Sequence, residues 1–161
     1  MNTTFRCAIV LAAASCGALT ACTEPEADPI GTFSTELGQH LHQRNVSYVD
    51  LARIGSKSWD ALFLFGPYSS RAHMCDALAL SWLRCQFTMP SDVPEGLYLL
   101  VFRASDGLRP EWHARSNGDF YAPENSVPQP ILPSAARFAV VPTAQLTPNG
   151  HQWLRLAYRK P

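Results

Sequence analysis

Charged residues are scarce in this chain of 161 residues, and neither sign is in excess. Lys and Arg together number 13, as do Asp and Glu, and charged residues make up 16% of the sequence. Proteins that bind nucleic acid carry Lys and Arg in a surplus, gathered in a stripe or patch, because phosphate contacts dominate their affinity. The sequence contains no such stripe, which argues against a nucleic-acid partner.

The sequence also lacks the short motifs of common catalytic and nucleotide-binding sites. It contains no GxSxG or SxxK nucleophile motif, no HExxH zinc motif, and neither GxGxxG nor GxxxxGK[ST]. No zinc-ligand spacing is present among the five histidines, His40, His42, His73, His113 and His151. We therefore expect no catalytic residues, no metal and no cofactor. A metal held by His40 and His42 is the alternative to two solvated polar positions, and it requires a strand that places both on one face.

The longest apolar run lies near the amino terminus and is too short to span a bilayer comfortably. Residues 1–6 form a short, positively charged lead, and residues 7–19 are apolar, whereas a membrane-spanning helix needs about 20 apolar residues. This composition is typical of a secretory signal peptide. The signal ends in Leu19, Thr20, Ala21 and Cys22, which resembles the lipobox of bacterial lipoproteins.

The lipobox resemblance implies that the chain is cut before Cys22 and that lipid is attached to its thiol. Each buried CH₂ contributes about 0.8 kcal/mol, so two or three acyl chains make a durable membrane anchor. Thr23 in the second position, rather than aspartate, resembles cargo sent to the outer membrane, where the protein would face the periplasm. The alternative is an ordinary secretory signal cut after Ala21. We thus expect a signal peptide over residues 1–21, an acidic, proline-bearing tether over 22–31, and a single domain over 32–161.

Two cysteines remain once the signal is removed and Cys22 carries lipid. Cys75 and Cys85 are ten residues apart, which on one continuous helix would separate them by about 15 Å, whereas a disulfide needs Cα atoms roughly 4.4 to 6.8 Å apart. We predict a disulfide, as is common in exported proteins, with a helix over 69–82 that ends between the cysteines and a strand over 84–88. Two buried free thiols are the alternative.

The remaining periodicity predicts an α+β fold with a mainly antiparallel sheet, an N-terminal helix, and a second short helix after the "FGPY" strand. Apolar residues at four-residue spacing predict the first helix over 32–41. The run "SWDALFLFGPY" reads as a central strand covered on both faces, with Trp59 on the same face as Phe63 and Phe65. The other expected strands are 46–54, a hairpin of 96–107 with 108–115, and the pair 136–143 and 152–159. The proline-rich stretch 116–134 is expected to be a long ordered loop.

The segment "WDALFLFGPY" resembles a group of small uncharacterised bacterial lipoproteins marked by a Trp-Asp pair, an apolar run and Phe-Gly-Pro-Tyr. The resemblance covers about thirty residues and implies no established activity. Gly66 and Pro67 break the strand, so the segment is interpreted as a structural corner capped by Ser69 or Ser70. The alternative is a binding cleft at the strand end, lined by Trp59, Asp60 and Tyr68.

A second candidate surface lies in or beside the proline-rich loop. It comprises Trp112, Phe120, Tyr121, Ile131 and Leu132. Aromatic and aliphatic side chains on an extended segment are typical of a partner-binding edge. The same residues could instead fold back as a lid over the sheet.

Taken together, these features favour a lipid-anchored protein of the bacterial cell envelope that acts by binding rather than by catalysis. It would block a toxin or lytic enzyme that reaches the periplasm, or assist envelope assembly, and its partners would be the membrane and an envelope or periplasmic protein. The alternative is a small periplasmic hydrolase or carbohydrate-active enzyme that uses Asp60, His73, His113 or Asp119. A purely structural lipoprotein without a preferred partner is the third hypothesis.

Overall fold

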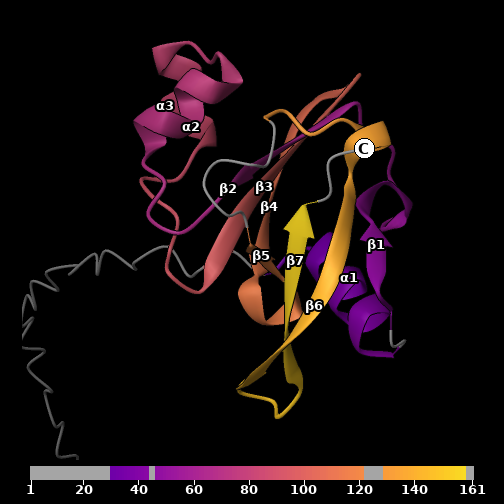
Figure 1. Cartoon of the computed structure of the whole chain (residues 1–161). Coiled ribbons are helices and arrows are strands. Elements are labelled where there is room, and N and C mark those ends of the chain that lie inside the picture. Colours follow the sequence, from indigo (N-terminus) through magenta and orange to yellow (C-terminus); the bar gives the residue numbers. More distant parts are fainter. Residues whose placement is uncertain (1–29, 44–45, 122–128, 159–161) are drawn as a thin grey trace, which may run out of the picture.

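The computed structural model describes residues 30–43, 46–121 and 129–158, and within them three α-helices and seven strands form an α+β fold (Figure 1). The predicted fold class is confirmed. The helices are α1 (Thr32–Gln43), α2 (Arg71–Leu78) and α3 (Trp82–Thr88), and the strands are β1 (Tyr48–Asp50), β2 (Ala61–Phe65), β3 (Leu97–Ala104), β4 (Gly107–Ala114), β5 (Asp119–Tyr121), β6 (Arg137–Leu146) and β7 (Gln152–Tyr158). No helix in these ranges is both long and apolar enough to cross a bilayer.

The strands form two sheets rather than the single sheet expected. One has the order β2-β3-β4 and is antiparallel throughout; the other has the order β1-β6-β7-β5 and is antiparallel except for the pair β5 and β7. The predicted hairpins are confirmed: β3 and β4 pair from Leu97 opposite Ala114 to Ala104 opposite Gly107, and β6 returns as β7 through residues 147–151.

The three-stranded sheet separates two hydrophobic cores, because successive side chains of β2 and β3 point to opposite faces. Leu62, Leu100 and Phe102 face a core shared with α1 and the four-stranded sheet. Phe63 and Val101 face a second core, which α2, α3 and the segment up to Val93 complete. Figure 1 shows the corresponding layers, with α2 and α3 on one side of the three-stranded sheet and α1 on the other. The prediction that both faces of β2 are covered is therefore confirmed.

The predicted position of β2 at the centre of a sheet is wrong, because β3 is central and β2 lies at the edge. Its outer side is covered by another segment: Leu62 and Ile131 exchange backbone hydrogen bonds of 2.8 and 2.9 Å, and the Gln129 side-chain amide bonds both backbone groups of Leu64. Trp59 precedes the strand and packs in the α1 core, so its predicted placement with Phe63 is also wrong. An edge strand buried on both faces has the same apolar composition as a central one, which explains the error.

The region of the two cysteines contains a second helix where a strand was predicted. After α2 the backbone turns at Ala79, which adopts a left-handed conformation with φ of 53°, and α3 begins at Trp82. This turn brings Cys75 and Cys85 to disulfide distance, with Cα atoms 5.7 Å apart. The expectation that the helix ends between the cysteines is confirmed, but the predicted strand over 84–88 is wrong because the chain forms α3 there.

Two further predictions are right only in part. The expected strand over 46–54 shortens to β1, since Asp50 accepts a hydrogen bond from the backbone N–H of Ala52 at 3.1 Å and begins a 3₁₀ turn, Leu51–Arg53. The expected loop over 116–134 contains β5, whose parallel pairing with β7 joins residues more than thirty positions apart. Such pairing depends on a distant partner, so local sequence carries little sign of it.

Candidate functional site

The most densely connected polar side chain in the described residues is the carboxylate of Asp119. Asp119 follows a short 3₁₀ turn, Arg115–Asn117, which places the side chain of Arg115 beside this carboxylate. Its two oxygens accept hydrogen bonds from Arg115 Nε and Nη2 at 2.9 and 3.1 Å, from the Tyr98 hydroxyl at 2.8 Å and from Trp153 Nε1 at 3.1 Å. The turn, β3 and β7 are thereby tied to β5 at one point.

These contacts hold the site in one protonation state. Burial alone would raise the pKa of Asp119, but the hydrogen bonds from Arg115, Tyr98 and Trp153 outweigh it and lower that pKa. Burial and the same carboxylate raise the pKa of Tyr98. At neutral pH Asp119 is therefore an anion and Tyr98 a neutral donor. An acid or base in catalysis must exchange protons near the working pH, so this arrangement favours a structural role.

His113 lies beside this group and is completely buried in β4. Its Nε2 is 2.7 Å from the carbonyl oxygen of Gly118, which can only accept, so Nε2 carries the proton. Burial is the main cause that lowers the pKa of His113 to about 4, and Nδ1 has no hydrogen-bond partner in the described residues. The imidazole packs against the rings of Tyr98 and Phe120 and is neutral at pH 7.

The four residues of the hydrolase hypothesis do not meet in one cleft. His113 and Asp119 are neighbours, but they are buried in the interior. Asp60 is exposed just before β2, and His73 is exposed on α2, where it contacts Phe65 edge-on. In the part of the chain that the structure describes, no three His, Cys, Asp or Glu side chains are placed to hold a metal ion.

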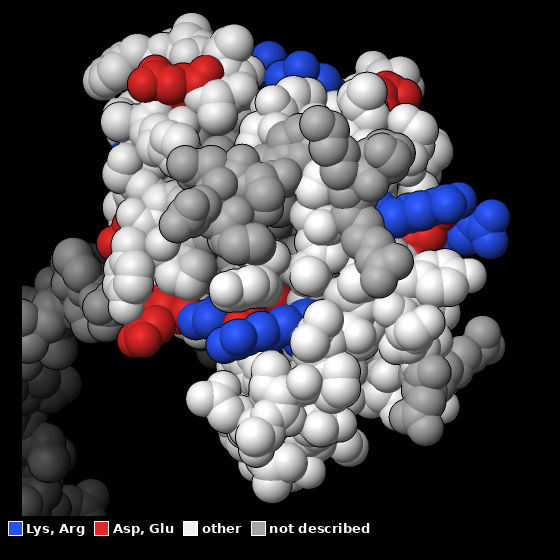
Figure 2. Space-filling view, viewed as in Figure 1, with Lys and Arg blue, Asp and Glu red and all other residues white. Residues whose placement is uncertain are grey.

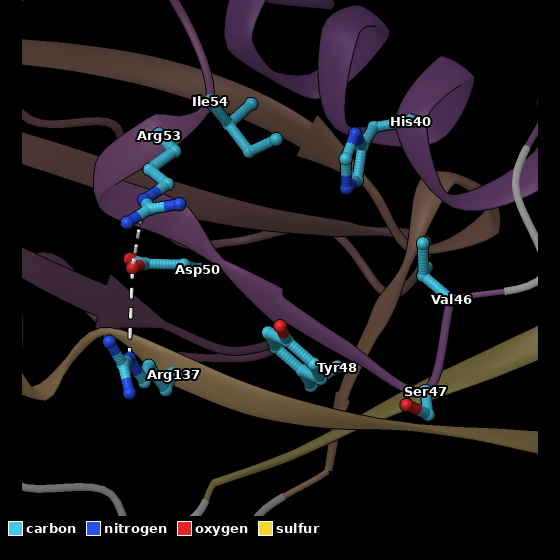
Figure 3. A pocket seen from close by; sticks show the side chains of 8 residues that line it. All are labelled: His40, Val46, Ser47, Tyr48, Asp50, Arg53, Ile54 and Arg137. Atoms are coloured by element: carbon cyan, nitrogen blue, oxygen red, sulfur yellow. Dashed lines mark ion pairs between the residues drawn. The ribbon is translucent and has the colours of Figure 1, made fainter.

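A solvent-open pocket of about 490 Å³ lies between β1 and the end of α1, and Figure 3 shows its lining. Asp50 is placed at the end of β1, where it pairs directly across the sheet with Arg137 and caps the turn that carries Arg53. Its Oδ2 is 3.6 Å from Arg53 Nε and 3.7 Å from Arg137 Nε. One carboxylate thus lies between two guanidinium groups, within ion-pair distance of both (Figure 3). His40, Val46, Ser47, Tyr48 and Ile54 complete the lining.

The charges of this pocket are unequal in number and in exposure. The Asp50 side chain is 16% exposed, whereas the side chains of Arg53 and Arg137 are 81% and 66% exposed. Two cations share one anion that is turned inward, so the outer surface presents a positive charge. Tyr48, 65% exposed, lies beside them. Exposed Arg and Tyr are the residue types enriched at the energetic centres of protein interfaces.

A second hollow of about 490 Å³ adjoins this pocket and shares Val46 and Ser47 with it. His42 from α1 and His151 from the loop before β7 stack there with ring centroids 4.9 Å apart. The rest of its lining is apolar or uncharged, including Leu41 and Leu154. The charged pocket therefore adjoins a groove along the β6–β7 hairpin whose lining contains no Lys, Arg, Asp or Glu.

The face seen in Figure 2 carries its charged residues in a few small groups separated by white, uncharged surface. The chain from Pro142 to Trp153, which forms most of the β6–β7 hairpin, contains no Lys, Arg, Asp or Glu. Recognition on such a surface depends on individual charged pairs rather than on a broad field.

The residues singled out from the sequence are distributed over several places. Trp59 is buried and lines a cavity of about 210 Å³ with Phe102 and Glu111, whereas Tyr68 is 72% exposed beyond the other end of β2. Neither Asp60 nor Tyr68 shares a described pocket with Trp59, so these three residues do not form one cleft there.

The five residues of the predicted loop surface are also divided. Phe120 and Ile131 are buried in the α1 core, as the lid alternative expects. Tyr121 and Leu132 are 46% and 50% exposed, and Trp112 packs against the other core. Cys22 and residues 122–128 lie outside the described residues.

Tyr48, Arg53 and Arg137 were not predicted as site residues from the sequence. The spacing of Asp50 and Arg53 is visible in the sequence, but Arg137 joins them only through the pairing of β1 with β6. In comparisons with protein-family models, curated proteins and solved structures, the chain has no significant match. Any functional assignment must therefore come from its own residues.

Proposed function

We propose that this protein is a lipid-anchored component of the bacterial cell envelope and that it acts by binding an acidic segment of another envelope or periplasmic protein. Lipid on Cys22 would hold it at the outer membrane, facing the periplasm. The binding site is the pocket around Asp50, with Arg53, Arg137 and Tyr48 as its contact residues. An inhibitory or immunity role and a role in envelope assembly both use such a site.

This proposal rests on one observation. Two exposed guanidinium groups, of Arg53 and Arg137, share the carboxylate of Asp50, whose side chain is mostly buried. Asp50 contacts each arginine through Nε, at 3.6 and 3.7 Å. A guanidinium group has further N–H donors in a planar fork, which suits a second carboxylate with two parallel hydrogen bonds. Asp50 lies within ion-pair distance of both side chains, so the two guanidinium groups are close enough together to meet one ligand segment.

Binding is favoured over catalysis because the two neighbouring acid and base groups of the hydrolase hypothesis, Asp119 and His113, are buried and already hydrogen-bonded. Both carboxylate oxygens of Asp119 already accept hydrogen bonds. His113 is buried and donates its Nε2–H to the carbonyl oxygen of Gly118. Arg53 and Arg137, in contrast, are open to solvent. No observation favours the hydrolase hypothesis, so we do not propose it.

A binding assay with the purified full-length protein tests the site. The probe is a fluorescein-labelled octapeptide with four Glu residues, and a peptide with four Lys in their place serves as the control. We expect the acidic peptide alone to bind, and Arg53→Gln with Arg137→Gln to weaken it by at least about tenfold, or 1.4 kcal/mol. Lys57→Gln removes one positive charge from an exposed position outside this pocket and should leave binding unchanged, whereas Arg53→Gln alone, which also removes one, should weaken it.

The partner and the anchor need separate measurements. Affinity purification from envelope extracts should recover a protein in fixed stoichiometry with the wild type and with Lys57→Gln, but not with the double arginine variant. Mass spectrometry of the amino-terminal peptide should find Cys22 acylated. Equal binding of both peptides by all variants would contradict the proposed site, and an unmodified Cys22 would contradict the proposed location.

A further inference from the structure

Helix α3 presents an apolar face to solvent. Trp82, Leu83 and Phe87 are 74%, 60% and 83% exposed, whereas Cys85 of the same helix is buried. At about 100° per residue the three exposed side chains fall within an arc of about 140°, in which Gln86, bonded to Arg71, is the polar residue. A helix on a globular protein ordinarily turns such a face inward, and contiguous exposed apolar groups mark an interaction surface.

The α3 face is held rigidly. The Cys75–Cys85 pair joins α3 to α2, and Arg71 Nε donates to the carbonyl oxygens of Met89 and Pro90 at 3.0 and 3.1 Å, directly after α3. Arg71 Nη1 also donates to Gln86 Oε1 at 2.6 Å. Figure 1 shows α2 and α3 as a lobe that stands away from the four-stranded sheet. The exposed side chains are therefore presented on a fixed support.

The amino-terminal end of the described chain lies next to α3. Gly31 donates its backbone N–H to the carbonyl oxygen of Trp112 at 2.9 Å, and Gly31 and Phe87 line the same depression of about 500 Å³. Ile30 lies only eight positions after Cys22, which limits their distance to about 28 Å when the chain is fully extended. A lipid on Cys22 would keep this side of the protein close to the bilayer surface.

We infer that the α3 face, made of Trp82, Leu83 and Phe87, rests on the membrane that holds the lipid anchor. This inference rests on the proposed lipidation of Cys22. Trp and Phe favour the boundary between headgroups and acyl chains, and an apolar helix face lying in the interface adds to a covalent lipid as a second binding signal. Arg84, the one charged residue of α3, is exposed and complements anionic headgroups. Contact at α3 would fix the orientation of the domain relative to the bilayer.

Fluorescence quenching of the full-length protein, purified from cell membranes and reconstituted into vesicles, tests this contact. The vesicles contain phosphatidylethanolamine and phosphatidylglycerol, with or without bromine on the acyl chains near the headgroup. We expect the brominated lipid to reduce the tryptophan emission of the wild type, and Trp82→Phe to abolish at least about half of that reduction. Trp153→Phe, which alters a tryptophan of β7, is the matched control and should retain it.

The acylation state of Cys22 is measured on the same samples by mass spectrometry. Acylated protein whose emission is not quenched, or whose quenching survives Trp82→Phe, overturns the α3 contact while leaving the anchor intact. Protein with an unmodified Cys22 overturns both proposals. A dimer in detergent that Phe87→Ser dissociates would identify a second copy as the occupant of the face, which also overturns the membrane contact.

Discussion

The burial of His113 leads to a quantitative prediction of how the free energy of unfolding depends on pH. The pKa of its imidazole is lowered in the fold from 6.5 to about 4, mainly by burial. Between these values the unfolded chain binds a proton that the folded chain does not, so this contribution to stability is present above the unfolded pKa and is lost as the pH falls. One pKa unit corresponds to about 1.4 kcal/mol, so the full loss is about 3 kcal/mol.

The assay is urea unfolding of the purified protein at a series of pH values from about 7 to 4.5, a range that ends above the ordinary pKa of carboxyl groups such as Asp119. The wild type should lose about 2 kcal/mol of unfolding free energy across this range through His113 alone. His113→Gln retains an N–H donor for the Gly118 carbonyl but does not titrate. It should cost about 1 kcal/mol at pH 7 and remove most of the pH dependence.

His73→Gln is the matched control, because His73 is exposed on α2 and its loss should leave the pH profile of the wild type. The reasoning would be refuted if His113→Gln lost as much stability on acidification as the wild type. It would equally be refuted if NMR titration of the folded protein placed the His113 pKa near 6.5.

Two other substitutions test the contacts that hold the fold. Asp119→Ala leaves the partly buried Arg115 without its carboxylate and should lower the free energy of unfolding in urea by about 2 kcal/mol. As a control, Asp106→Ala in the exposed β3–β4 turn should lower it by less than about 0.5 kcal/mol. Equal effects of the two substitutions would contradict the structural role of Asp119. Replacing Cys75 and Cys85 together by Ser should lower stability by about 3 kcal/mol through the short closed loop, and unchanged unfolding in the presence and absence of a reductant would contradict the disulfide.

Local patterns in the sequence were sufficient for the hairpins and for the first helix. The apolar run through residues 97–102, the polar alternation that follows and the turn between them are short-range features, and both strands form as expected. The break between Cys75 and Cys85 was also predictable, because disulfide geometry excludes one continuous helix. The conformation after the break was not, since a left-handed Ala79 allows a second helix as readily as a strand.

The candidate binding pocket could not be predicted in the same way. Arg137 reaches Asp50 because β1 and β6 pair across almost ninety residues, and no local pattern specifies that register. Phe120 and Ile131 are buried whereas Tyr121 and Leu132 are exposed, and this difference could not be predicted either. The burial of a residue in this segment depends on the distant strand with which it pairs. The sequence shows which residues are aromatic, but not whether their side chains point into the core or toward solvent.

Among the described residues, the four-stranded sheet joins the first strand to the last two, and β7 lies between β6 and β5. The major core therefore cannot close until residues up to Tyr158 have left the ribosome, because Phe138 and Leu156 are central to it. Until then α1 and β1 lack the part of this core that Phe138 and Leu156 supply. A chain with this topology can complete its larger core only after β7 has been synthesised.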